Sequence, residues 1–159
     1  MNKKFAEKTR VTADKSERDI KKALSDFGAA KRLVYEEDAQ CVIMFEYENK
    51  RIRFTQPYPD PSAPEFTHTA TGRERTNEDA ARQWQQECNR RWRALALIIK
   101  AKLVYVSEGT RVFEDEFLAN IVLPNNQTVG EYLAPQLGES LANGKMPPLL
   151  PRIGETGRQ

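Results

Sequence analysis

Residues 76–106 read TNEDAARQWQQECNRRWRALALIIKAKLVYV, and this stretch says more about the fold than any other part of the chain. At 3.6 residues per turn, its apolar side chains gather on one side of a helix of about thirty residues. The apolar stripe comprises Ala81, Trp84, Cys88, Trp92, Leu95, Ala96, Ile99, Leu103 and Val106. We therefore predict a long helix that begins at Thr76, ends near Gly109 and buries both Trp84 and Trp92.

The opposite side of the predicted helix is polar and basic, and carries Arg82, Asn89, Arg93 and Lys100. Arg91 and Lys102 lie beside the apolar stripe, where we expect them to pair with the acidic run Glu114–Glu116. Leu97 lies on the second face of the helix. A homo-oligomer is expected if a second copy of the chain covers that part of the helix.

Three strands are predicted upstream of the long helix, after a helix over Ser16–Phe27. The first strand covers residues 31–35. Residues 40–47 are apolar on both faces except for Glu46, as in a central strand, and Glu48-Asn49-Lys50 turns the chain into residues 51–55. In that last strand arginines alternate with Ile52 and Phe54, which predicts one packed and one open face.

The remaining segments are predicted from their prolines and capping residues. Four prolines in residues 57–76 indicate a long crossing loop. A short helix is expected over Phe113–Ile121, and a last helix over Thr128–Asn143, where Pro135 should kink or restart it. Residues 146–151 are expected to lie extended on the core.

These elements predict an α+β fold, with a three-stranded antiparallel sheet packed against an N-terminal helix and a long central helix. The C-terminal helices are expected to complete the core. We assign residues 14–151 to one domain, and residues 1–13 and 152–159 to flexible tails. The chain is 159 residues long, 39% hydrophobic and 30% charged, which is typical of a globular protein.

Other features of the sequence limit where the protein can be located and which reactions it can catalyse. There is neither a secretory signal nor an apolar run long enough for a membrane span, so we expect a cytoplasmic protein without a membrane partner. Cys41 and Cys88 are expected to be buried and reduced. His68 is the one histidine, and no metal set, catalytic nucleophile or cofactor motif accompanies it. We therefore expect a protein with no metal, no cofactor and no enzymatic activity.

Charge suggests nucleic acid as the partner. Residues 1–34 are basic and residues 35–49 contain only acidic charges, although the net charge is only +2. Two strips could contact phosphates, and they comprise Arg51 and Arg53 on the open strand face and Arg82, Arg93 and Lys100 along the helix. Tyr47, Tyr58 or Phe66 would stack on unpaired bases if exposed. In the alternative, the acidic blocks contact a host protein, and the chain inhibits or modulates a host enzyme or defence complex.

Several motifs carry a resemblance to known proteins. They are Arg51-Ile52-Arg53-Phe54, residues 91–103, Phe113 with residues 116–119, and residues 121–124, 128–131, 144–147 and 149–151. In this order they resemble a family of phage and prophage proteins over about residues 15–151. The resemblance implies an accessory protein expressed in a bacterial cytoplasm, and it brings no activity or site residues. Relatives tend to have a glycine turn where this chain has Glu48-Asn49-Lys50.

The order helix, three strands, helix is also similar to that of double-stranded RNA-binding domains and of the core of phage annealing proteins. This is an analogy of fold alone, and it implies no function by itself. The proline-rich loop and the long helix depart from the first class, and the chain is short for the second.

Overall fold

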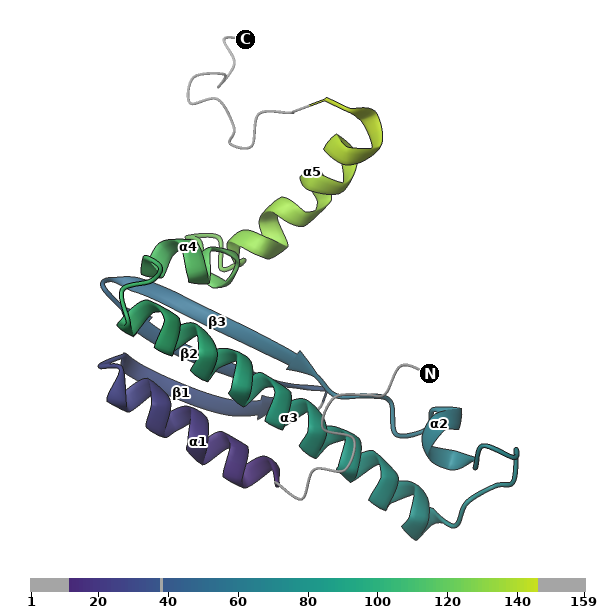
Figure 1. Ribbon diagram of the computed structural model, residues 1–159. Coiled ribbons are helices and arrows are strands. Elements are labelled where there is room, and N and C mark those ends of the chain that lie inside the picture. The colour runs from purple at the N-terminus through teal and green to yellow at the C-terminus, as the bar shows by residue number, and fades with distance from the viewer. Residues whose placement is uncertain (1–11, 38, 146–159) are drawn as a thin grey trace.

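The computed structural model describes residues 12–37 and 39–145 and has the predicted α+β architecture (Figure 1). Its elements are α1 (Ala13–Asp26), β1 (Ala30–Glu37), β2 (Gln40–Tyr47), β3 (Lys50–Pro57), α2 (Pro64–Thr67), α3 (Asn77–Ser107), α4 (Phe113–Phe117), the 3-10 helix η1 (Leu118–Asn120) and α5 (Val129–Asn143). The three strands, the N-terminal helix, the long central helix and the C-terminal helices are confirmed.

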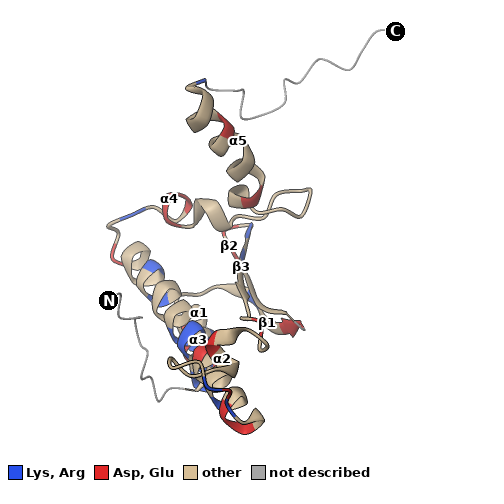
Figure 2. Cartoon of the chain, turned by 90° about the vertical axis from the view of Figure 1, so that its right-hand side faces the viewer, with Lys and Arg blue, Asp and Glu red and all other residues tan. Residues whose placement is uncertain are grey.

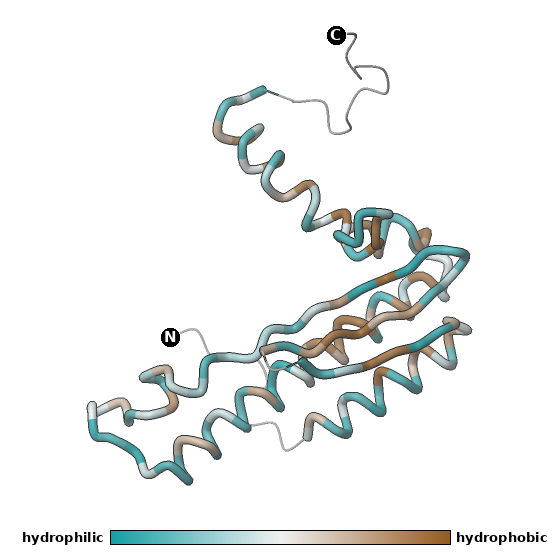
Figure 3. Tube along the Cα trace, turned by 180° about the vertical axis from the view of Figure 1, so that it is seen from behind, coloured by the Kyte–Doolittle hydropathy of each residue, from teal (hydrophilic) through white to brown (hydrophobic). Residues whose placement is uncertain are grey.

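The sheet is antiparallel in the order β1-β2-β3, so the most apolar strand lies at its centre. Figure 3 shows this as the hydrophobic colouring of β2. The β2–β3 turn has positive φ at Glu48 (46°) and Asn49 (62°), as a two-residue hairpin of type I′ requires. Asparagine tolerates this conformation, so the hairpin forms without glycine.

One face of the sheet is covered by α1 and α3, and the main core lies between these two layers (Figure 1). Trp92 is 1% exposed, and Phe113 and Phe117 of α4 close the core beside the β2–β3 hairpin. The buried cluster comprises Ile20, Leu24, Ala29, Cys41, Ile43, Phe45, Ile52, Phe54, Trp92, Leu95, Ala96, Ile99, Leu103, Phe113 and Phe117.

The last helix corrects one expectation, because α5 contributes no residue to the main core described above. It packs against η1, where Gly130 approaches Ala119 closely, and then extends away from the sheet (Figure 1). It also runs as one helix through Pro135 and does not restart there. Thr128 and Glu131 form the predicted capping box at its start.

The N-terminal helix begins three residues earlier than expected. Thr12 is its N-cap and accepts a hydrogen bond from the backbone N–H of Lys15, so Ser16 lies inside α1 and is buried. The predicted tail over residues 1–13 therefore overlaps the start of α1. Residues 1–11, the expected extended segment 146–151 and the expected tail 152–159 lie outside the described residues.

Trp84 is half-buried, and the prediction that it lies in the core is wrong. The N-terminal part of α3 extends beyond the sheet (Figure 1), and Trp84 contacts the proline-rich segment. The Trp84 indole Nε1 donates a 2.8 Å hydrogen bond to the Pro59 carbonyl, and its ring contacts Tyr58 edge-on. Segment 57–76 is also more ordered than expected, because it contains α2, with Phe66 buried.

The predicted pairing of α3 with the acidic run is half right. Lys102 Nζ lies 2.7 Å from Glu116 Oε1, as expected. Arg91 instead bonds to Glu87 and to the Pro57 carbonyl, because its position faces the end of β3 and not α4. Glu114 pairs with Lys50 of the hairpin at 2.6 Å, which lowers the pKa of that carboxyl group, so two of the acids hold α4 in place.

Candidate nucleic-acid interface

The five predicted phosphate-contacting residues do not form one surface. Arg51 and Arg53 project from the face of the sheet opposite the helices, because Ile52 and Phe54, which alternate with them, lie in the core. Arg93 and Lys100 line a groove between α1 and α3 on the other side of the molecule. Arg82 lies on the first turns of α3, outside the sheet (Figure 1).

The side chain of Arg53 is held by contacts within the fold. Its side chain is 16% exposed, and Nη2 donates a 2.6 Å hydrogen bond to Glu131 Oε2 at the start of α5. The Asn120 side chain donates to the Arg53 backbone carbonyl. Arg53 therefore joins β3 to the C-terminal region, and its guanidinium is largely withdrawn from solvent.

Arg51 is the accessible cation of the open strand face. Its side chain is 53% exposed, and its nearest carboxylate contact is long, at 3.9 Å from Nε to Glu46 Oε1. It lines a pocket of about 520 Å³ together with Glu46, Asn49, Val122, Leu123, Pro124 and Asn126. The pocket is large enough for a small ligand.

Backbone pairing fixes the two walls of this pocket. Ile121 forms a β-bridge with Ile52, and the Val122 N–H donates a 2.8 Å hydrogen bond to the Arg51 carbonyl. The chain then turns at Asn126, whose φ is 66°, and returns to Thr128. The loop 121–128 is thereby held against the β2–β3 hairpin, which places Arg51 between the two turns.

The residues that line the pocket carry several kinds of polar group. The guanidinium of Arg51 can bind a phosphate or the edge of a base. The side-chain amides of Asn49 and Asn126 can donate and accept hydrogen bonds, and Glu46 can accept from an exocyclic amine. Leu123 and Pro124 supply apolar surface. Sequence reasoning identified Arg51 and treated the two asparagines as turn residues only.

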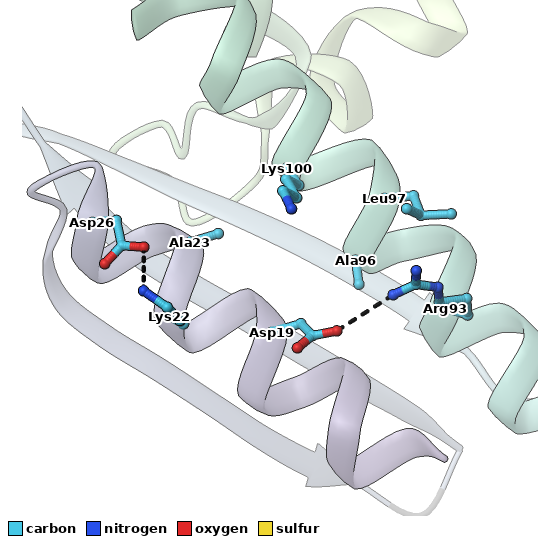
Figure 4. Close-up of a pocket in the computed structure, with 8 residues that line it drawn as sticks. All are labelled: Asp19, Lys22, Ala23, Asp26, Arg93, Ala96, Leu97 and Lys100. Atoms are coloured by element: carbon cyan, nitrogen blue, oxygen red, sulfur yellow. Dashed lines mark hydrogen bonds and ion pairs between the residues drawn. The ribbon is translucent and has the colours of Figure 1, made fainter. Parts of the chain in front are cut away.

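The other three predicted cations lie on α3, away from the pocket beside Arg51. Arg82 bonds to Asp79 within the same helix, and Arg93 pairs with Asp19 of α1 at 3.3 Å (Figure 4). Lys100 is exposed at the rim of the same groove, and it has no ion-pair partner among the residues drawn in Figure 4. These three residues are too far around the molecule to extend the surface at Arg51.

The three aromatic rings expected to stack on bases make contacts within the fold, and one of them, Phe66, is buried. Tyr47 contacts Phe27 and Phe113. The Tyr58 hydroxyl donates to Glu36 at 2.7 Å, and burial together with this bond raises the pKa of Tyr58. Phe66 is 4% exposed. Phe66 is therefore closed to a base, and Tyr47 and Tyr58 are half-buried and engaged in contacts within the fold.

The carboxylates, the histidine and the two cysteines decide whether a metal or thiol site is available. In residues 12–37 and 39–145, no group of three or more His, Cys, Asp or Glu side chains could hold a metal ion. Cys41 and Cys88 are free and buried, and burial raises the pKa of each thiol to about 11. Both thiols are therefore protonated and unreactive at neutral pH.

None of the helices in the described part of the chain is long and apolar enough to span a bilayer. Comparisons with protein-family models, curated proteins and solved structures found no match to this chain.

Proposed function

We propose that this protein is a phage or prophage accessory protein that acts in the cytoplasm of a bacterial host and binds single-stranded nucleic acid without catalysis. An unpaired nucleotide would enter the pocket beside Arg51. The observation that supports this function is the pocket of about 520 Å³, which is lined by the exposed Arg51, by Asn49 and Asn126, and by the apolar residues Leu123 and Pro124. A base inside a duplex could not enter it without leaving the stack.

The charge near the pocket favours a small number of phosphate contacts. Arg51 is opposed by Glu46, and Arg53 is occupied by Glu131. The affinity should therefore depend on salt only weakly, with a log–log slope of about −0.7 to −1.4 for one or two neutralised phosphates on a single strand. Selectivity for unpaired over paired nucleic acid is expected, since the pocket admits a base and not a helix.

Fluorescence anisotropy with labelled single-stranded and duplex DNA and RNA, at several salt concentrations, tests the proposal. Arg51→Ala should weaken single-strand binding roughly tenfold or more, as the loss of one charged hydrogen bond predicts. Asn126→Gly should weaken binding while leaving the salt slope unchanged, because glycine accepts the left-handed backbone at this position.

Arg82→Ala is the matched control, because it removes an equal charge far from the pocket. Binding should be unchanged in this variant. An equal loss in Arg82→Ala and Arg51→Ala would show that only general charge attracts the nucleic acid. Absence of binding at low salt would overturn the proposal.

A second candidate function, protein binding, is favoured by a different observation. Leu137 and Leu141 are 54% and 79% exposed on α5, the helix that extends from the fold (Figure 1). The acids on α5 are Glu131 and Glu139, and residues 129–143 contain no basic residue (Figure 2). The partner would be a host protein, such as an enzyme or a defence complex, with an apolar groove and a basic rim that accepts a helix.

A pull-down from the bacterial cytoplasm, followed by binding of the purified partner, tests this candidate. The double variant Leu137→Ser/Leu141→Ser should lose the partner, whereas Val112→Ser, at another exposed apolar residue, should retain it. Retention of the partner by both variants would exclude α5 as the contact.

A further inference from the structure

Strand β1 lies at one edge of the sheet, and no described residue pairs with its outer side (Figure 1). The other edge, along β3, is partly closed, because Ile121 bridges to Ile52 and the Val122 N–H donates to the Arg51 carbonyl. In an antiparallel ladder every second residue directs its N–H and C=O away from the neighbouring strand. The outer side of β1 therefore offers a row of backbone groups on which another strand can pair.

The sequence of β1 is complementary in charge to itself. Residues 31–37 read KRLVYEE, with two cations at the start, two carboxylates at the end and apolar side chains between them. Antiparallel pairing of this strand with a second copy about Val34 places Leu33 opposite Tyr35 of the other copy. Arg32, in the β-bulge just before Leu33, then faces Glu36 of the other copy. Parallel pairing would instead place like charges side by side.

The two charges that meet in this arrangement have no ion-pair partner among the described residues of one copy. The guanidinium of Arg32 donates a 2.6 Å hydrogen bond to a backbone carbonyl. The carboxylate of Glu36 accepts a 2.7 Å hydrogen bond from the neutral hydroxyl of Tyr58. Lys31 already pairs with Glu46 at 2.6 Å, so we assign Lys31 no role in the contact.

The middle of β1 adds an apolar contact to these charges. Leu33 is 51% exposed, and it lies on the face of the sheet opposite the helices, because its partner Met44 alternates with the core residues Ile43 and Phe45. Tyr35 is two residues further along β1 and shares this face. In the antiparallel pair, the ring of Tyr35 from each copy would cover Leu33 of the other.

We propose that two copies of this protein pair through the outer edges of β1, antiparallel about a two-fold axis at Val34, to form one continuous sheet of six strands, three from each copy. The interface is isologous, so each copy contributes the same strand. The pocket beside Arg51 is lined by the β2–β3 hairpin and by loop 121–128. The dimer therefore stands independently of the nucleic-acid proposal.

Sedimentation velocity over a range of protein concentrations tests the assembly and its register. The unaltered chain should form a dimer, and Arg32→Glu should raise the dimer dissociation constant roughly tenfold or more, because each copy then sets two carboxylates against each other. The double variant Arg32→Glu/Glu36→Arg should restore the dimer, since the exchanged charges again face opposite charges. Lys100→Glu, which reverses an exposed cation on α3, is the matched control and should remain dimeric.

Three outcomes would overturn the proposal. They are a monomeric unaltered chain at the highest soluble concentration, a dimer that Arg32→Glu leaves unchanged, and an equal loss in Lys100→Glu. A double variant that stays monomeric with an unchanged far-ultraviolet circular dichroism spectrum would contradict the pairing of residue 32 with residue 36.

Amide hydrogen exchange tests whether β1 forms the contact. Within residues 32–36, the amides on the outer side of β1 should exchange slowly where the unaltered chain is dimeric, and faster in Arg32→Glu at the same concentration. Amides of residues 92–103 in the core part of α3 should exchange equally in both proteins. Equal exchange along β1 in the dimer and in the monomer would show that another surface forms the dimer.

Discussion

Individual side chains on the same helical stripe have different environments in this protein. Trp92 lies between α3 and the sheet and is fully enclosed, whereas Trp84, eight residues earlier, is half-buried and contacts the proline-rich segment. Both lie on the apolar side of α3, so helical spacing alone cannot distinguish them. The difference arises because α3 is longer than the sheet it covers (Figure 1).

Trp92→Ala should lower the free energy of unfolding by about 3–5 kcal/mol, since it leaves a cavity among buried side chains. Urea denaturation followed by circular dichroism measures this loss. Leu141→Ala is the control at an exposed site, and it should change the free energy by no more than about 0.5 kcal/mol. A small loss in both variants would show that the indole is not enclosed.

Glu131 links a helix cap to an ion pair. Its carboxylate accepts a 2.8 Å hydrogen bond from the Thr128 N–H and a second bond from Arg53. These contacts, the backbone hydrogen bond first, lower the pKa of Glu131 in the folded state. The stabilisation is therefore complete above the unfolded pKa of about 4.3, and it is lost as the pH falls through the folded pKa.

Glu131→Gln should therefore be less stable than the unaltered chain at neutral pH, and the difference should shrink below a pH of about 4. Thermal unfolding at a series of pH values measures the effect. Glu139→Gln, on the exposed surface of the same helix, should follow the unaltered chain throughout. A constant difference between Glu131→Gln and the unaltered chain across the pH range would contradict this assignment.

At the scale of elements, the proline-rich segment has its own anchors. The short helix α2 buries Phe66, and Arg75 donates to the carbonyl oxygens of Glu65 and Phe66. A β-bridge joins His68 to Glu74. The indole of Trp84 holds the start of the segment through the Pro59 carbonyl. The segment is therefore attached to the part of α3 that extends past the sheet.

Trp84→Phe should loosen this segment without unfolding the core, because it removes the indole donor and keeps an aromatic ring. Hydrogen exchange should become faster over residues 60–75, while the global free energy of unfolding falls by about 0.5–1.5 kcal/mol. Gln85→Ala, at a neighbouring exposed position, should leave both unchanged. Unaltered exchange in Trp84→Phe would show that other contacts hold the segment.

In the whole molecule, α5 packs outside the main core. The main core draws on α1, the sheet, α3 and α4, and α5 packs against η1 beyond it. The polar and apolar colouring of α5 in Figure 3 continues past the region where it meets the fold. In its second half Leu137 and Leu141 are exposed, although Ser140 is buried.

Hydrogen exchange should reflect this separation. Amides of residues 137–143 should exchange much faster than those of residues 92–103, because a short helix without tertiary packing is marginally stable in water. Binding of a partner protein on α5 should slow their exchange. Equal protection of the two segments in the isolated protein would mean that α5 is already covered.

The candidate site was only partly predictable. The alternation of arginine with Ile52 and Phe54 places Arg51 on the open face of β3, and the structure agrees. The pocket itself depends on loop 121–128, some seventy residues later, which pairs with β3 through Ile121 and Val122. Sequence periodicity carries no information about such a distant pairing. It also could not show that Arg53 is occupied by Glu131.

The α+β class, the strand order, the long helix and the cap of α5 could be read from the sequence, because these follow from local periodicity and capping side chains. The three-dimensional packing shows in addition that the basic strips lie on opposite sides, that Trp84 is half-buried and that α5 leaves the core. Those outcomes depend on which elements are longer than the surfaces they cover and on contacts between distant segments. A local stretch of sequence shows neither the relative lengths of packed elements nor the contacts between distant segments.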